Sequence, residues 1–200
     1  MSDSLERRKL ARAAFRLALR RKSILPPLVL MTDDERLADP VAAARRLPRG
    51  SMVVVRAREP SRRAALTSTM LELARERHLI VLVADDPALA GLADGLHLPE
   101  AKLAQAARWR ACRRLLVTGS AHSLGALARA RFLDAVFLSP VFPTPSHPER
   151  PALSAVRANL MAQKSRVPVY ALGGVTARNG GRLYGLCGIA AIGALSPDQT

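Results

Sequence analysis

The chain has 200 residues, of which 49% are hydrophobic and 4% aromatic, a balance that is typical of one globular domain with a substantial core. The abundance of Ala, Leu and Val favours helices packed on a parallel sheet over a β-sandwich. No apolar run is long enough to cross a bilayer, and the basic N-terminal segment does not resemble a secretory signal. The two cysteines, Cys112 and Cys187, are too few for a disulfide framework or a metal cluster. We therefore expect a reducing, cytoplasmic location.

The formal net charge of +15 is the most unusual global property of the chain. A charge of this size is common in proteins that bind nucleic acid or an anionic membrane surface. Because the basic residues are spread along the chain without a recognisable nucleic-acid motif, we favour basic helix faces that point to solvent, and we expect no specific nucleic-acid partner. Small substrates that carry phosphate would also suit a positive field.

Residues 4–22 are predicted to form a basic helix. Its apolar positions, Leu5, Leu10, Ala14, Phe15 and Leu17, form a loose stripe, and arginines and lysines fill most of the other faces. Such a segment can lie on a membrane surface, but more often the stripe packs on the domain of the same chain. We favour packing.

From residue 26 the pattern changes to short apolar runs separated by helical or turn segments. The runs are predicted as strands at residues 28–31, 52–56, 79–83, 95–98, 115–118, 135–138, 167–172 and 189–192. Helices are predicted at residues 41–47, 61–77, 87–90, 101–110, 124–131, 154–164 and 178–183. Ser61 and Asp86 are predicted N-caps, and Pro87 suits a first helical position.

Eight continuous apolar strands that alternate with helices predict parallel pairing with both faces of the sheet covered. The count of eight predicts an α/β fold, a compact TIM (β/α)₈ barrel at residues 26–200. No eighth helix is expected, because the sequence stops at Thr200, shortly after the eighth strand. We expect the basic helix of residues 1–25, or a partner subunit in a homo-oligomer, to cover the outer face of that strand.

A barrel of this kind draws its functional site from residues at the C-terminal ends of its strands. Two arginines after the second strand, Arg56 and Arg58, are suited to clamp phosphate groups. Asp85 follows the third strand, where a carboxylate could hold Mg²⁺ against a diphosphate. Ser120 and His122 follow the fifth strand, and an imidazole at that place could act as acid or base.

The loop at residues 139–148 contains four prolines, which restrict its conformations, and it carries hydroxyl groups and one imidazole. Side chains of this loop and backbone N–H groups of the last two loops could cradle a monophosphate. These residues are Thr144, Ser146, His147, Gly173, Gly174 and Gly193. His97, in contrast, lies inside an apolar run and is predicted to be a buried structural residue.

Six short motifs stand at these strand ends, at residues 31–33 (MTD), 55–59 (VRARE), 94–99 (DGLHLP), 119–123 (GSAHS), 139–148 (SPVFPTPSHP) and 171–175 (ALGGV). In this order, from about residue 28 to residue 195, they resemble the motifs of the thiamine phosphate synthase/TenI family. The resemblance implies a TIM barrel that binds the thiazole phosphate precursor of thiamine. In the synthase, the thiazole nitrogen attacks the methylene group of hydroxymethylpyrimidine diphosphate, and pyrophosphate leaves with the help of Mg²⁺.

Several residues match functional positions of that family. The resemblance implies that Arg56, and Arg58 in place of a lysine, contact the diphosphate, and that Asp85 binds Mg²⁺. It implies phosphate or diphosphate contacts for the hydroxyl and backbone groups of Ser120, Thr144, Ser146, Gly174 and Gly193, with His147 in place of a lysine.

Other positions depart from the pattern. Lys102 stands where a second Mg²⁺-binding aspartate is expected, which removes a ligand and reverses the charge. Val54 and Ala84 replace a glutamine and an asparagine, so polar anchors for the pyrimidine are lost. We expect synthase chemistry first, because Asp85 and the arginines persist. The alternatives are a TenI-like thiazole tautomerase that uses His122, and a non-catalytic phosphate-binding barrel.

Overall fold

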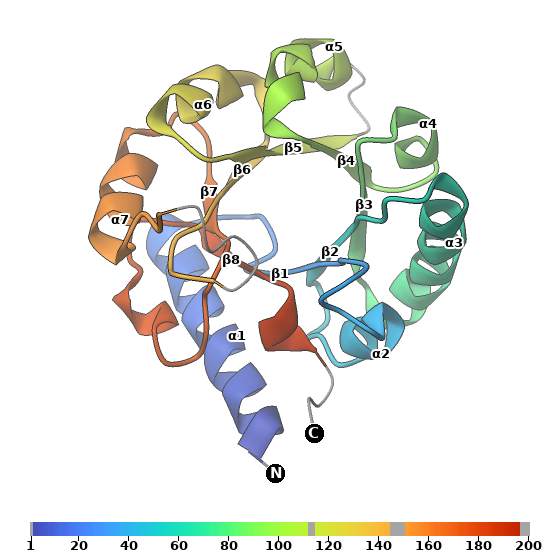
Figure 1. The fold of residues 1–200 in the computed structure, drawn as a ribbon, viewed down its shortest axis with the longest axis horizontal. Helices are drawn as coiled ribbons and strands as arrows, with labels where there is room; N and C mark the ends of the chain where they lie inside the picture. Colours follow the sequence, from blue (N-terminus) through green and yellow to red (C-terminus); the bar gives the residue numbers. More distant parts are fainter. Residues whose placement is uncertain (1, 112–114, 145–150, 197–200) are drawn as a thin grey trace.

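A computed structural model of the chain describes residues 2–111, 115–144 and 151–196. Eight parallel strands follow one another around a closed barrel in sequence order (Figure 1). The strands are β1 (Leu28–Met31), β2 (Met52–Val55), β3 (Ile80–Ala84), β4 (Gly95–Leu98), β5 (Leu116–Ala121), β6 (Ala135–Leu138), β7 (Val169–Ala171) and β8 (Gly188–Ala191). The predicted TIM barrel is therefore confirmed.

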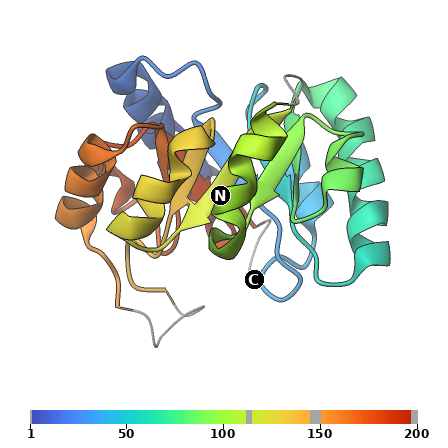
Figure 2. The ribbon, with the colours of Figure 1, turned by 90° about the horizontal axis from the view of Figure 1, so that it is seen from above.

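Helices surround the barrel and connect most of the strands (Figures 1 and 2). The α-helices are α1 (Ser2–Arg21), α2 (Pro40–Arg45), α3 (Pro60–Arg77), α4 (Pro87–Ala90), α5 (Ala106–Arg110), α6 (Leu124–Arg129) and α7 (Ala155–Lys164). Short 3₁₀ helices are η1 (Glu100–Gln105), η2 (Ala130–Phe132), η3 (Gly180–Arg182) and η4 (Gly193–Leu195). Among the helices of the described residues, none is long and apolar enough to cross a membrane.

The barrel closes where β8 pairs with β1, with Val29 opposite Ala190. The Ile189 N–H donates to the Pro27 carbonyl over 2.9 Å, and the Tyr170 hydroxyl donates to the Pro26 carbonyl over 2.6 Å. A Cβ at Gly188 would lie 2.6 Å from the Tyr170 ring. The absence of a side chain at Gly188 thus makes room for the ring that ties β7 to the entrance of β1.

Nearly every strand residue is buried, and aromatic rings fill part of the barrel interior. The rings of His97 and Phe137 lie 4.9 Å apart between centroids, and those of Phe137 and Tyr170 lie 5.0 Å apart. The strands read as continuous apolar runs because helices cover the outside while these side chains fill the inside. The side chain of Cys187 is also buried.

Helix α1 takes the place of an eighth helix, on the outside of the barrel next to α7 (Figures 1 and 2). It contacts β8, η3 and β1, and beyond β8 the described residues contain only the short helix η4. Its buried side chains recur at helical spacing: Leu10, Ala13, Ala14, Leu17 and Ala18. The compact barrel with an extra N-terminal helix is confirmed, and the described residues after β8 form no further α-helix.

Three local predictions were wrong. Leu5 and Phe15 of the expected stripe are exposed, because the buried face of α1 runs through Leu10 and Leu17 instead. Helix α3 begins at Pro60, so Glu59, not Ser61, is its N-cap. The α-helix expected at residues 178–183 is only the short 3₁₀ helix η3, because two of its residues are glycines, which have a low helix propensity.

The predicted N-cap Asp86 is confirmed, because its carboxylate accepts from the Leu89 N–H over 3.1 Å.

A matched pair of substitutions tests the packing of α1. We expect Leu17→Ala to lower the free energy of unfolding by about 2–5 kcal/mol, because this 2% exposed side chain fills the contact with the barrel. Leu19→Ala removes the same atoms from a 63% exposed position and should change it by less than ~0.5 kcal/mol. Urea unfolding of both variants measures the difference. Equal losses would show that α1 does not stabilise the barrel through this face.

Candidate functional site

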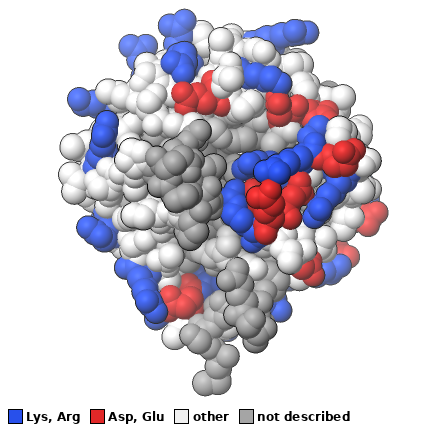
Figure 3. Space-filling model, in the orientation of Figure 1, with Lys and Arg blue, Asp and Glu red and all other residues white. Residues whose placement is uncertain are grey.

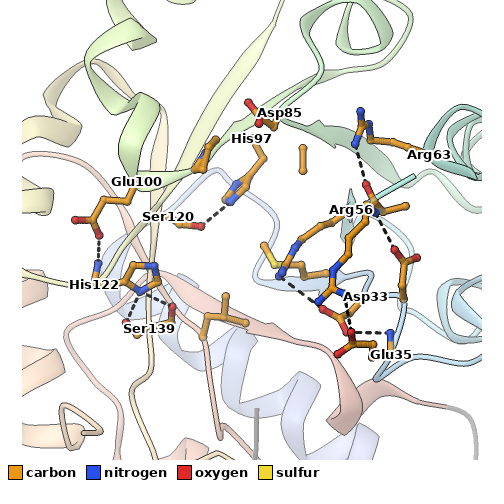
Figure 4. Close-up of a pocket in the computed structure, with 17 residues that line it drawn as sticks. Asp33, Glu35, Arg56, Arg63, Asp85, His97, Glu100, Ser120, His122 and Ser139 are labelled. Atoms are coloured by element: carbon orange, nitrogen blue, oxygen red, sulfur yellow. Dashed lines mark hydrogen bonds and ion pairs between the residues drawn. The ribbon is translucent and has the colours of Figure 1, made fainter. Parts of the chain in front are cut away.

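A hollow of about 390 Å³ opens at the C-terminal end of the barrel (Figure 4). It is lined by residues at or just after the C-terminal ends of β1 to β7, among them Arg56, Asp85, Ser120 and His122. Acidic and basic side chains gather beside this mouth, over the end of β2 (Figure 3). The parallel topology brings these strand ends to one rim although they are far apart in the sequence.

The predicted site residues fall into two adjoining hollows instead of one cavity. The first hollow holds Arg56, Arg58, Asp85, Ser120 and His122. A second hollow, of about 570 Å³, holds Thr144, Gly173, Gly174 and Gly193. Both are lined by Glu35 and Leu172, so they meet at these two residues. Ser146 and His147 lie outside the described residues, and their predicted contacts stay predictions.

Thr32 fixes the position of Arg56 at the floor of the first hollow. The buried Thr32 hydroxyl donates to the Arg56 carbonyl over 2.9 Å and accepts from the Arg56 N–H over 2.8 Å. One Arg56 guanidinium nitrogen lies 3.7 Å from the Asp33 carboxylate. Burial alone would raise the pKa of Asp33, but the hydrogen bonds and charge of Arg36 and the N–H groups of Glu35 and Arg36 lower the pKa to about 2. Asp33 is therefore ionised near neutral pH, and its negative charge attracts the Arg56 guanidinium.

Each carboxylate that lines the first hollow is paired with a cation of the same chain. The pairs are Asp33 with Arg36 (2.6 Å), Asp34 with Arg62 (3.2 Å), Glu35 with Arg58 (2.8 Å), Asp85 with Lys102 (2.6 Å) and Glu100 with Arg129 (3.2 Å). Three arginines, Arg56, Arg58 and Arg63, also line the hollow. A guanidinium group has five N–H donors, so an arginine in an ion pair keeps donors for the oxygens of an anionic ligand.

Ser120 is held by a buried chain of hydrogen bonds. His97 Nε2 lies 2.9 Å from Ser120 Oγ, and His97 Nδ1 lies 2.9 Å from Thr118 Oγ1. Burial, and to a lesser degree the charge of Arg56, lowers the pKa of His97 to about 3. The ring is therefore neutral near pH 7 and positions the Ser120 hydroxyl without adding charge. His97 is buried as predicted, and it also lines the hollow.

His122 lies on the same rim, where two contacts orient it (Figure 4). Its Nδ1 lies 2.8 Å from the Ser139 carbonyl oxygen and its backbone N–H donates to Glu100 over 2.7 Å. Because a carbonyl oxygen only accepts, Nδ1 carries the proton in this contact. In the neutral ring Nε2 is then an unprotonated nitrogen, which is the form that a general base requires.

The surroundings of Asp85 do not fit the predicted Mg²⁺ ion. Asp85 has a positive φ of 55°, and its carboxylate is bound to the Lys102 ammonium. Among the residues that the structure describes, no group of three or more His, Cys, Asp and Glu side chains could hold a metal ion. Mg²⁺ is commonly held by one or two carboxylates together with substrate phosphates and waters, and the Asp85 carboxylate is already bound to an ammonium group. Its binding at Asp85 stays a prediction that these side chains do not support.

The second hollow offers backbone groups in an unusual conformation. Gly173 and Gly174 both have positive φ angles, 86° and 65°. A Cβ at Gly174 would lie 2.4 Å from the Pro143 carbonyl oxygen, so only glycine allows the loops after β6 and β7 to approach this closely. Successive N–H groups in such a turn form a concave surface that suits a phosphate.

Charged residues of the first hollow that were not predicted from the sequence include Glu35, Arg63 and Glu100. Arg63 stands in the first turn of α3 and donates to the Ala57 carbonyl over 2.8 Å and to Asp86 over 3.3 Å. No pattern in the sequence distinguishes it from the other arginines of α3. Glu100 directly follows the motif at residues 94–99, so its place after β4 is a signal that could have identified it.

A family model and a solved structure both match this chain over most of the barrel. The sequence matches a family model described as thiamine monophosphate synthase over residues 28–195. A solved structure, thiamine phosphate pyrophosphorylase from Pyrococcus furiosus, superposes with a TM-score of 0.68 at 23% identity and covers 87% of each chain. At this identity the superposition establishes a shared fold.

Curated relatives match shorter stretches. A putative thiamine-phosphate synthase 2 of Aquifex aeolicus (strain VF5) is 39% identical over 114 residues, which are 52% of this chain and 60% of that protein. A thiamine-phosphate synthase of Parasynechococcus marenigrum (strain WH8102) is 34% identical over 140 residues, 66% of this chain and 40% of that protein. The chain thus spans about half the length of the curated relatives it matches.

The buried ring of His97 predicts a pH dependence of stability. The unfolded chain protonates this histidine below its ordinary pKa of 6.5, whereas the folded protein does so only near pH 3. Between these pH values the unfolded state therefore binds more protons than the folded state. The contribution of the neutral His97 ring to the free energy of unfolding is complete above pH 6.5 and falls by about 1.4 kcal/mol per pH unit below it. We expect His97→Gln to remove that part of the slope in urea unfolding measured across this range.

His78→Asn is the control for this measurement, because His78 is an exposed histidine at the end of α3. Its stability should follow the wild-type pH profile. An unchanged slope in His97→Gln would contradict a neutral, buried His97.

Proposed function

Because the chain belongs to the thiamine monophosphate synthase family, we propose that it couples a phosphorylated thiazole to hydroxymethylpyrimidine diphosphate and releases pyrophosphate. The observation that carries this proposal is the pair of adjoining hollows. One is lined by Arg56, Arg58 and Arg63, the other is lined by a glycine turn, and both are lined by Leu172 and Glu35. Two neighbouring anion sites suit two phosphorylated substrates that must react with each other.

Each hollow is assigned to one substrate. The arginines of the first hollow, Arg56, Arg58 and Arg63, suit a diphosphate, because guanidinium groups bind phosphate oxygens in pairs. The turn at Gly173 and Gly174 suits the single phosphate of the thiazole. The reacting atoms would then meet near Leu172, where the two hollows join.

The reaction is a substitution at the pyrimidine methylene carbon. The lone pair of the thiazole nitrogen forms the new C–N bond, the C–O bond to the diphosphate breaks, and pyrophosphate leaves with that electron pair. The protein's part is to hold the two substrates in line and to stabilise the charge that grows on the leaving oxygen. In the tautomer in which His97 Nε2 donates to Ser120, the serine hydroxyl proton is available to this oxygen, and the arginines supply positive charge.

A second candidate is the proton transfer that aromatises a thiazole carboxylate phosphate. The specific observation in its favour is His122, whose Nδ1–H is bound to the Ser139 carbonyl and whose Nε2 is left as a base. The synthase reaction, a substitution at the pyrimidine methylene carbon, needs no such base. The cytoplasmic location and the homo-oligomeric state stay predictions.

The synthase proposal is tested by incubating the full chain with thiazole phosphate and the pyrimidine diphosphate and measuring thiamine phosphate by chromatography. We expect product, and we expect Ser120→Ala to lower kcat by about 10- to 100-fold through loss of one donor to the leaving group. Ser68→Ala, an exposed serine in the middle of α3, is the control and should leave kcat unchanged. Absence of thiamine phosphate from the wild-type reaction would overturn the proposal.

The tautomerase candidate makes its own prediction with the unaromatised thiazole carboxylate phosphate as sole substrate. We expect His122→Ala to reduce turnover by at least ~100-fold, because the proposed base is removed, while binding of the thiazole phosphate measured by calorimetry is retained. Turnover that survives in His122→Ala would exclude this histidine from the chemistry. Binding without turnover in the wild type would indicate a non-catalytic phosphate-binding barrel.

A further inference from the structure

The ion pair between Asp85 and Lys102 joins the ends of two neighbouring strands. Asp85 follows β3 directly, and Lys102 stands in η1, just after β4. The Lys102 Nζ lies 2.6 Å from Asp85 Oδ1, and both side chains are a little under half exposed. Asp85 lines the first hollow and Lys102 lies just outside its lining, so the pair is formed at the edge of the hollow and is partly exposed to solvent.

The backbone fixes Asp85 in place for this contact. Its N–H donates to the His97 carbonyl over 2.9 Å, and its positive φ of 55° is a conformation that residues other than glycine rarely adopt. Strained positions of this kind cluster at functional sites. The same β4 residue that supplies the carbonyl, His97, also holds Ser120, so the Asp85 backbone and the Ser120 hydroxyl are set by one strand.

The charge around the hollow leaves little room for a divalent ion. Every carboxylate that lines the hollow is already paired with an arginine or lysine, so a metal would have to displace a bound cation and would be repelled by it. A diphosphate meets the opposite situation. An ammonium has three N–H donors, and one bond to Asp85 leaves two for phosphate oxygens.

We propose that the first hollow binds the diphosphate of its substrate without a divalent metal ion, and that the Lys102 ammonium, held by Asp85, is the cation that replaces it. The inference rests on the proposed function, since it assigns the diphosphate to this hollow. Lys102 neutralises Asp85, which would otherwise repel the ligand, and adds a point charge beside Arg56 and Arg58. Departure of pyrophosphate then depends on charges that belong to the chain.

Inorganic pyrophosphate is the probe that tests this inference apart from turnover. Its binding to the full chain is measured by isothermal titration calorimetry, once in EDTA and once in excess MgCl₂. We expect binding in EDTA that MgCl₂ does not strengthen. Lys102→Gln should weaken it by about 10-fold, the size of one charge-assisted hydrogen bond at a partly exposed site. Lys102→Arg should restore most of the affinity, and Lys164→Gln, an exposed lysine at the end of α7, should bind as the wild type does.

A gain of metal dependence provides a second measurement. Lys102→Asp places two carboxylates side by side, so we expect this variant to bind pyrophosphate only when MgCl₂ is present. Wild-type binding that requires MgCl₂, no binding under either condition, or unchanged affinity in Lys102→Gln would each overturn the inference. Metal-free binding in a chain that makes no thiamine phosphate would instead remove the synthase proposal and leave the lysine site in place.

Discussion

Closure of the barrel between β8 and β1 is the constraint on which the rest of the structure depends. The pairing of Val29 with Ala190, the hydrogen bond from Tyr170 to Pro26 and the missing side chain of Gly188 act at the same seam. Once the seam is closed, the C-terminal ends of all eight strands form one ring. Side chains that are far apart in the sequence then face a common opening, and loop residues alone decide its chemistry.

The chemistry of this opening is dominated by paired charges. Each carboxylate that lines the first hollow is bound to a guanidinium or ammonium group of the chain. These carboxylates orient the cations, as Asp33 does for Arg56 and Asp85 for Lys102. Arginine and lysine side chains that are held in this way lose less freedom when a phosphate arrives, which is the physical advantage of a preorganised site.

The strands of the barrel could be predicted because buried parallel strands are continuous apolar runs in the sequence. The residues of the rim could be predicted because they are the polar residues at the C-terminal ends of those runs. The exact bounds were less accessible. Strand β7 is shorter than the predicted 167–172, since Pro168 has no N–H to donate, and β5 extends to Ala121 because its last residues pair with β6. A stripe that included Leu5 and Phe15 was equally compatible with the periodicity of α1.

The sequence predicted which residues belong to the candidate site better than it predicted how they are arranged. Position after a strand identified Arg56, Ser120 and His122, but it could not show that Thr144 and Gly174 line a second hollow. The partners of the carboxylates were also beyond the sequence. Helix α5 and strand β5 lie between Glu100 and Arg129 in the sequence, and only the folded barrel brings the two side chains to 3.2 Å. Lys102 had been noted as a charge reversal, and its contact with Asp85 gives that reversal a structural role.

The position of α1 has a consequence for synthesis on the ribosome. Helix α1 is translated before β8, a strand on which it packs, and the seven other strands of the barrel lie between them in the chain. Until then the nascent chain exposes an apolar, strongly basic helix that has no native surface to cover. Contacts between such distant segments slow folding. The arginines and lysines on its outer face keep the helix hydrated. Their like charges make the exposed helices of different chains repel each other, which opposes aggregation before the barrel is complete.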